Sequence, residues 1–148
     1  MKRVFYTGGF IYNPRNQKVL LRKTEGKQAS AAFSWESIGG VSKRGENQEK
    51  AIQRIFQEVI AQRLPMDSFH YLYDYPLDEV DMQKVAFVVF AADLKKEVKP
   101  KKGVEVGWHK LEEALKLDHL SPRTRQDLTF FSREIDAKKH RLPHLASL

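Results

Sequence analysis

The apolar residues of this 148-residue chain fall into short clusters with two kinds of spacing. Clusters rich in β-branched and aromatic residues, separated by turn-forming segments, are typical of strands. Runs with apolar residues three and four positions apart, introduced by a capping residue, indicate helices. The strands that this pattern predicts cover residues 4–12, 19–21, 35–38, 69–75, 84–92 and 104–108, and the helices cover residues 47–64, 111–117 and 122–135.

The two long helices have the clearest boundary signals. Asn47 is a plausible N-cap for the first helix, and Pro65 would end it. Ser121 is a plausible N-cap for the second, with Pro122 at the first helical position. The order of strands, helix, strands, helix predicts an α/β or α+β sandwich. We expect a single domain over residues 1–136, followed by a basic C-terminal tail over residues 137–148.

Composition narrows the class of protein. The longest apolar run, Val85–Ala92, is far shorter than the roughly 20 residues that span a bilayer, so no membrane partner is expected. The N-terminus has no uninterrupted apolar segment of the kind found in secretory signals. The chain has no cysteine, which excludes disulfides, thiolate metal sites and cysteine nucleophiles. These features favour a soluble protein in the cytoplasm.

Charge adds a bias toward polyanionic partners. The formal net charge is +7, and the lysines concentrate in "LKKEVKPKKG" (residues 94–103) and "AKKHRLPH" (residues 137–144). Neither stretch has the interleaved aromatic residues of a stacking platform for single strands, so we interpret them first as a solvated loop and tail. A nucleic-acid contact stays open, without a motif to support it.

The stretch "GVSKRGENQEKAIQRIFQEVIAQ" (residues 40–62) carries the candidate chemistry. Gly40, Glu46 and Arg54, separated by five and seven residues and followed by Phe56 and Glu58, resemble the Nudix box, G-x5-E-x7-R-E-U-x-E-E-x-G-U, in which U is a bulky aliphatic residue. Upstream, "WESIGG" is similar to the strand and turn that precede the box, and "EVGWHKLEEAL" downstream is similar to the segment that ends the Nudix sheet. The resemblance covers most of the chain.

Membership of this family implies a fold and a reaction. The fold would be a Nudix-type α/β/α sandwich with a central mixed sheet between two main helices. The reaction would be hydrolysis of a diphosphate linkage in a nucleotide-type small molecule. In the family, box carboxylates hold Mg²⁺ or Mn²⁺ on the substrate phosphates, and the metal activates the attacking water.

The resemblance is incomplete at the metal positions. Glu58 is the only glutamate left of the R-E-U-x-E-E run, because the first and last acids of that run are replaced by Ile55 and Val59. By the resemblance, Glu58 and Gly40 remain as candidates for the metal site. Glu46 and Arg54 are expected to pair structurally and to hold the turn over the helix. Three further box-region positions also differ from the pattern: Ile38, Ala61 and Gln62.

Two questions about the site stay open at this stage. Glu105 could serve as a remote general base, as the corresponding region does in some Nudix enzymes, together with Glu58 as the catalytic pair. Ile55 and Val59 share a helical side with Glu58, and a neighbouring loop, a second subunit of a homodimer, or an apolar part of a ligand would cover them. Because Glu46, Arg54 and Glu58 are retained, we expect Ile55 and Val59 to line the pocket.

These observations lead to two main functional hypotheses. The first is a Nudix hydrolase relative that binds a nucleoside diphosphate or triphosphate derivative, with weak Mg²⁺ or Mn²⁺ binding and weak or absent hydrolysis. The second is a non-catalytic module that uses the same fold to recognise a ligand or a partner. A fully active enzyme with relocated metal ligands is a third alternative.

Overall fold

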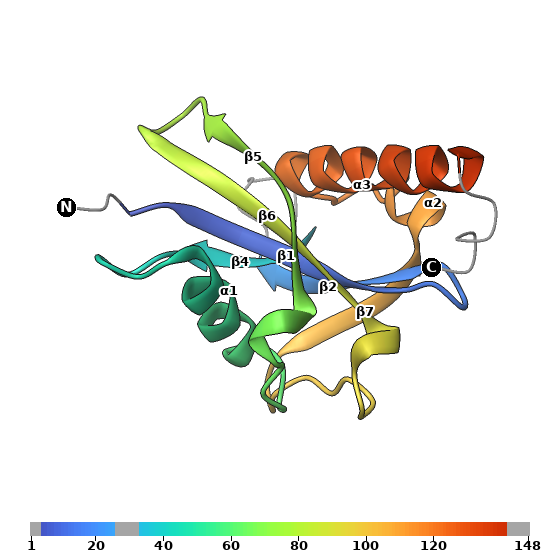
Figure 1. Cartoon of the computed structure of the whole chain (residues 1–148), viewed down its shortest axis with the longest axis horizontal. Coiled ribbons are helices and arrows are strands. Elements are labelled where there is room, and N and C mark those ends of the chain that lie inside the picture. Colours follow the sequence, from blue (N-terminus) through green and yellow to red (C-terminus); the bar gives the residue numbers. More distant parts are fainter. Residues whose placement is uncertain (1–3, 26–32, 142–148) are drawn as a thin grey trace.

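The centre of the molecule is a mixed seven-stranded sheet (Figure 1). The computed structural model describes residues 4–25 and 33–141. The first strand lies in the middle of the sheet, parallel to the sixth strand and antiparallel to the second and fourth. The third and seventh strands pair with the second, and the fifth pairs with the sixth. The strands are β1 (Tyr6–Asn13), β2 (Lys18–Glu25), β3 (Phe33–Glu36), β4 (Ile38–Val41), β5 (Phe69–Leu77), β6 (Met82–Phe90) and β7 (Glu105–Lys110).

Helices cover both faces of this sheet (Figure 1). On one face lies α1 (Gln48–Gln57), and on the other lie α2 (Leu111–Ala114) and α3 (Pro122–Arg141). Each face has its own buried apolar cluster, as expected for a sheet whose two sides are both covered. Short 3₁₀ turns, η1 (Met66–Ser68) and η2 (Ala91–Asp93), flank β5 and β6. No helix in the described part of the chain is long and apolar enough to cross a membrane.

The first long helix begins where the sequence predicts and ends earlier. Asn47 caps it, its side chain accepting a hydrogen bond from the backbone of Lys50 at 2.8 Å. The helix ends at Gln57 instead of Leu64, so that part of the prediction is wrong. The reason is a tertiary pairing, because residues 59–61 exchange backbone hydrogen bonds with residues 99–101. Those bonds satisfy backbone groups that a continued helix would have satisfied internally.

The strand before α1 and the last helix also differ from their predicted bounds. The strand expected over residues 35–38 is divided at Ser37 into β3 and β4, which pair with different neighbours. The Ser37 amide donates to the Thr124 hydroxyl at 2.9 Å, so this position is tied to α3 while the chain changes partner strand. The last helix continues through Arg141 instead of ending at Ile135. The rest of the expected tail, residues 142–148, and much of the expected loop, residues 26–32, lie outside the described residues.

Candidate functional site

Hydrogen bonds from the guanidinium of Arg54 hold the turn that joins β4 to α1. Arg54 donates two hydrogen bonds to the carboxylate of Glu46, at 2.9 and 3.0 Å, and a third to the carbonyl oxygen of Val41 at 3.1 Å. Glu46 also accepts from the amide of Lys43 at 2.9 Å. Hydrogen bonding to Arg54 lowers the pKa of the Glu46 carboxyl and raises the pKa of the Arg54 guanidinium. The structure thus brings together the two residues that the sequence predicts to pair.

Ile55 and Val59 lie in the apolar core on the α1 side of the sheet. Their side chains are 3% and 1% exposed and belong to the same cluster as Ile38 and Val85. Ile55 also lies against Gly40, at 3.6 Å from the position that a Cβ there would take. The prediction that these two residues line a pocket is therefore wrong. Both are core residues instead, and a neighbouring loop is hydrogen-bonded to the segment that contains Val59.

That loop is the lysine-rich segment, residues 94–103. Lys101 donates its amide hydrogen to the carbonyl of Val59, and Ala61 donates to the carbonyl of Lys99, both at 2.8 Å. The side chain of Gln62 donates to the carbonyl of Glu97 at 2.8 Å. The half-buried residues of the loop and of the strand that follows it pack on the same cluster as Ile55 and Val59: Leu94, Val98, Val104 and Val106. We call this closed arrangement of residues 59–62 against residues 94–106 the apolar seam.

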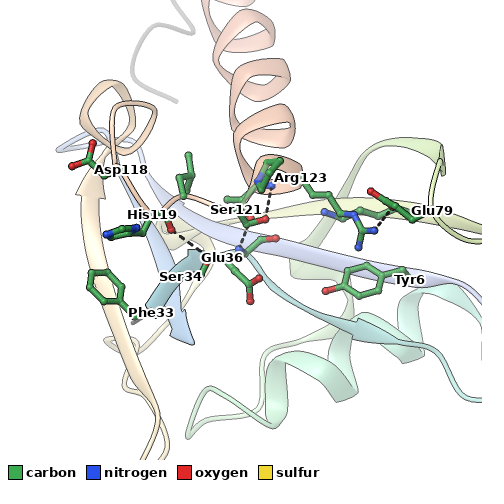
Figure 2. Close-up of a pocket in the computed structure, with 14 residues that line it drawn as sticks. Tyr6, Phe33, Ser34, Glu36, Glu79, Asp118, His119, Ser121 and Arg123 are labelled. Carbon is green, nitrogen blue, oxygen red and sulfur yellow. Dashed lines mark hydrogen bonds and ion pairs between the residues drawn. The ribbon is translucent and has the colours of Figure 1, made fainter. Parts of the chain in front are cut away.

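A separate cavity of about 420 Å³ lies on the other side of the sheet, beside the beginning of α3 (Figure 2). One wall is β3, which is hydrogen-bonded to the segment before α3. The Trp35 amide donates to the carbonyl of His119 at 2.7 Å, and the Ser121 amide donates to the carbonyl of Trp35 at 2.9 Å. In Figure 2, Phe33 and His119 stand on one side of the cavity. Tyr6 and Arg123 stand on the other side.

The cations that line this cavity already have acidic partners. Arg123 forms an ion pair with Glu79 at 2.5 Å, as the dashed line in Figure 2 marks. Lys84 forms an ion pair with Asp127 at 2.6 Å. Burial raises the pKa of the Tyr6 hydroxyl, which stays a neutral hydrogen-bonding group at physiological pH. The cavity therefore presents polar and aromatic groups with little free positive charge.

The Lys84–Asp127 pair is the part of the site that sequence reasoning missed. Both side chains are almost fully buried, at 1% and 2% exposure. The hydroxyls of Tyr73 and Tyr75 donate to the same carboxylate at 2.7 and 2.9 Å. A signal was available, since Asp127 lies three positions after Thr124 and four before Phe131, on the buried side of α3. An acid on the apolar face of a helix requires a buried partner.

Comparison with known proteins assigns the chain to a family. A family model described as the NUDIX domain matches residues 2–129. This chain belongs to the Nudix family. The resemblance seen in the sequence is thereby confirmed, and the mixed sheet between helices confirms the predicted fold class. No curated protein matches the sequence significantly.

Solved Nudix-type structures share the fold at low sequence identity. A MutT structure from a study of Aliivibrio salmonicida and Vibrio cholerae is 20% identical, with a TM-score of 0.65, covering 86% of this chain and 98% of that one. The ORF135 protein of E. coli is 21% identical, with a TM-score of 0.67 and coverages of 97% and 95%. A putative nudix hydrolase family member from Chromobacterium violaceum is 20% identical, with a TM-score of 0.68 and coverages of 97% and 88%.

The remaining Nudix-box candidates do not converge on one point. Glu58 is at the C-terminal end of α1, where it accepts a hydrogen bond from Arg54 at 3.0 Å. Glu105 is on β7, where its exposed carboxylate lies 3.7 Å from the ammonium of Lys23. The next residue, Val106, packs on the α1 side of the sheet, so Glu105 points to the α3 side. The sheet therefore separates the side chains of Glu58 and Glu105.

A half-buried histidine predicts a pH dependence of stability for this Nudix protein. The ring of His109 packs edge-on against Trp35, and its buried Nε2 atom has no hydrogen-bond partner within the described residues. Burial lowers the pKa of His109 in the folded state. Between the unfolded and folded pKa values only the unfolded chain binds this proton, so stability is full at pH 7 and decreases as pH falls below about 6.5.

We expect the melting temperature of the wild type to fall between pH 7 and pH 5 more steeply than that of His109→Gln. Differential scanning calorimetry at several pH values measures this slope. The matched control is His70→Gln, because His70 is exposed and 3.4 Å from Asp93. The expectation is contradicted if His109→Gln and the wild type lose the same number of degrees.

Proposed function

We propose that this Nudix protein binds a nucleotide-type ligand and that its metal-dependent hydrolysis of diphosphate linkages is weak or absent. The observation that carries the proposal is the apolar seam. Two positions at which the family pattern has acids, Ile55 and Val59, are core residues here, and the backbone of Val59 is hydrogen-bonded to the lysine-rich loop. Water-filled space for a hydrated cation and a phosphate is therefore replaced by packed side chains at these positions.

The side chains at the box do not fit Mg²⁺ or Mn²⁺ well. Such ions prefer hard oxygen ligands, and one carboxylate binds them only weakly in the absence of substrate phosphates. Glu58 supplies the one carboxylate left of the R-E-U-x-E-E run, and it is already paired with Arg54. Within residues 4–25 and 33–141, no three acidic or histidine side chains are grouped so that they could hold a metal ion.

The cavity beside α3 supports a ligand of nucleoside size. Its volume of about 420 Å³ is in the range of pockets for small organic molecules. Phe33 offers an aromatic surface, while the hydroxyls of Ser34 and Thr124 are among the polar groups of the lining. Because Lys84 and Arg123 are neutralised by their partners, the cavity favours the uncharged nucleoside part, with the phosphates directed toward solvent.

Isothermal titration calorimetry with a panel of nucleosides, nucleoside diphosphates and nucleoside triphosphates tests the proposal. Each compound is titrated in EDTA and again in Mg²⁺, and phosphate release is measured in parallel. We expect at least one compound to bind with an affinity that changes less than about threefold between the two conditions, without turnover. Binding that requires Mg²⁺, or multiple turnovers per protein, would favour an active hydrolase instead.

A pair of aromatic variants locates the binding. Phe33→Ala removes an aromatic surface from the cavity and is expected to weaken binding about tenfold, since a stacked base contributes about 1–3 kcal/mol. Tyr71→Ala is the control, because Tyr71 is 55% exposed on β5 and does not line this cavity. An equal effect of both variants would place the ligand elsewhere. If no compound in the panel binds, the proposal fails and the partner-binding alternative takes its place.

A further inference from the structure

A second cavity, of about 390 Å³, lies between the segment that follows α1 and the beginning of the lysine-rich loop. Its apolar lining comes from buried Leu64, half-buried Leu94 and exposed Pro65. Three exposed cations, Arg63, Lys95 and Lys96, complete the lining together with Asp93 and Gln62. The cavity thus combines an apolar surface with positive charge, and it shares no residue with the cavity beside α3.

The cations of this second cavity are free to bind an external anion. Within the described part of the chain, Arg63, Lys95 and Lys96 form no ion pair, side-chain hydrogen bond or ring contact. The acid nearest to them in the lining, Asp93, is 3.4 Å from the Nε2 atom of His70. This contrasts with the cavity beside α3, whose two cations are already paired. Unpaired cations around an apolar surface suit a ligand with a flat organic body and a phosphate.

Three more lysines follow later in the same loop. Lys99, Lys101 and Lys102 are exposed and, like the cations of the cavity, have no ionic partner among the described residues. Their backbone is fixed, because the loop pairs with residues 59–61 and Lys101 also accepts a hydrogen bond from Val104 at 3.0 Å. Binding to a fixed loop requires less ordering of the backbone than binding to a mobile tail. The loop therefore adds three exposed cations on a hydrogen-bonded backbone.

We propose that this surface binds a single-stranded polynucleotide. One base and its sugar would pack on Leu64, Pro65 and Leu94, with the attached phosphate on the cavity's cations. The neighbouring phosphates would lie on Lys99, Lys101 and Lys102. A polynucleotide fits better than a free nucleotide, because the second group of lysines lies outside the cavity that one nucleotide would fill. The net charge of +7 adds long-range attraction for such a ligand.

Fluorescence anisotropy with a labelled oligouridylate of about 12 nucleotides tests this proposal. The variant Arg63→Ala/Lys95→Ala/Lys96→Ala is expected to bind at least about tenfold more weakly than the wild type. Its plot of log affinity against log salt concentration is expected to be shallower by about 0.7, because these cations hold one phosphate and each phosphate contact to a single strand contributes about 0.7. The control is Lys110→Ala/Lys116→Ala/Arg133→Ala, which removes the same charges at exposed positions on β7, after α2 and on α3. We expect this control to retain the wild-type salt slope.

Three results would overturn the proposal. The first is no measurable binding of the oligouridylate by the wild type at low salt. The second is an equal loss of affinity and slope in both triple variants, which would indicate a response to net charge alone. The third is displacement of the oligomer by uridine monophosphate that binds each site as tightly as the oligomer does, which would indicate a mononucleotide site. The triple variant Arg63→Ala/Lys95→Ala/Lys96→Ala is expected to leave mononucleotide binding in the separate cavity beside α3 unchanged, so failure here is distinguishable from failure of the proposed function.

Discussion

Replacing both Ile55 and Val59 with glutamate is expected to unfold the protein or to lower its free energy of unfolding by about 5 kcal/mol or more. Both side chains are almost fully buried in the apolar cluster on the α1 side of the sheet. Two carboxylates placed there would lose hydration without gaining a cationic partner. Added Mg²⁺ is not expected to restore the wild-type free energy of unfolding, because the apolar seam blocks its approach. Chemical denaturation with and without Mg²⁺ measures both effects.

The matched control is Gln57→Glu/Ala61→Glu, which adds two carboxylates at exposed positions near the same end of α1. We expect it to change the free energy of unfolding by less than about 1 kcal/mol. The opposite result would be a stable Ile55→Glu/Val59→Glu protein that Mg²⁺ stabilises and that hydrolyses nucleotides. Such a protein would mean that the loop opens readily and that these positions still converge on a metal site.

Replacing Asp127 with asparagine is expected to lower the free energy of unfolding by about 3–5 kcal/mol. The change leaves the buried ammonium of Lys84 without a counter-ion, while the amide oxygen can still accept from Tyr73 and Tyr75. The double variant Lys84→Met/Asp127→Asn removes both charges and is expected to recover much of the loss. Urea denaturation of the two variants and the wild type gives the three free energies.

The exposed ion pair between Glu79 and Arg123 provides the control for the buried pair. Glu79→Gln breaks the ion pair with Arg123, whose side chains are 67% and 37% exposed, and is expected to cost less than about 1 kcal/mol. If Asp127→Asn lowers the free energy of unfolding no more than Glu79→Gln does, the buried pair of Lys84 and Asp127 contributes no more to stability than an exposed ion pair.

Local signals in the sequence were sufficient to predict the turn between β4 and α1 and the first residues of the two long helices. The cap by Asn47 and the pairing of Glu46 with Arg54 each involve residues close in the chain, in a pattern that a single stretch displays. The order of strands and helices, with the family resemblance, was sufficient for the mixed sheet between two helical layers. These features depend on local propensity and on spacing that the sequence shows directly.

The contacts between distant segments could not be predicted in the same way. The apolar seam joins residues 59–62 to residues 97–101 by backbone hydrogen bonds, and backbone pairing leaves little mark on residue types. An apolar Ile55 and Val59 are equally compatible with a pocket wall and with a core. Lysines in the loop indicated exposure, which is correct for their side chains, but not that their backbone is ordered. The wall that β3 forms with residues 119–121 was missed for the same reason.

The central claim is that the face of α1 on which Nudix hydrolases hold metal is closed and apolar in this protein. Titration of the wild type with Mn²⁺, followed by the electron paramagnetic resonance signal of the free ion and with no nucleotide present, tests it most directly. We predict only weak binding in the millimolar range, as expected for a single carboxylate paired with Arg54. One equivalent of Mn²⁺ bound in the low micromolar range, and lost in Glu58→Gln, would contradict the claim.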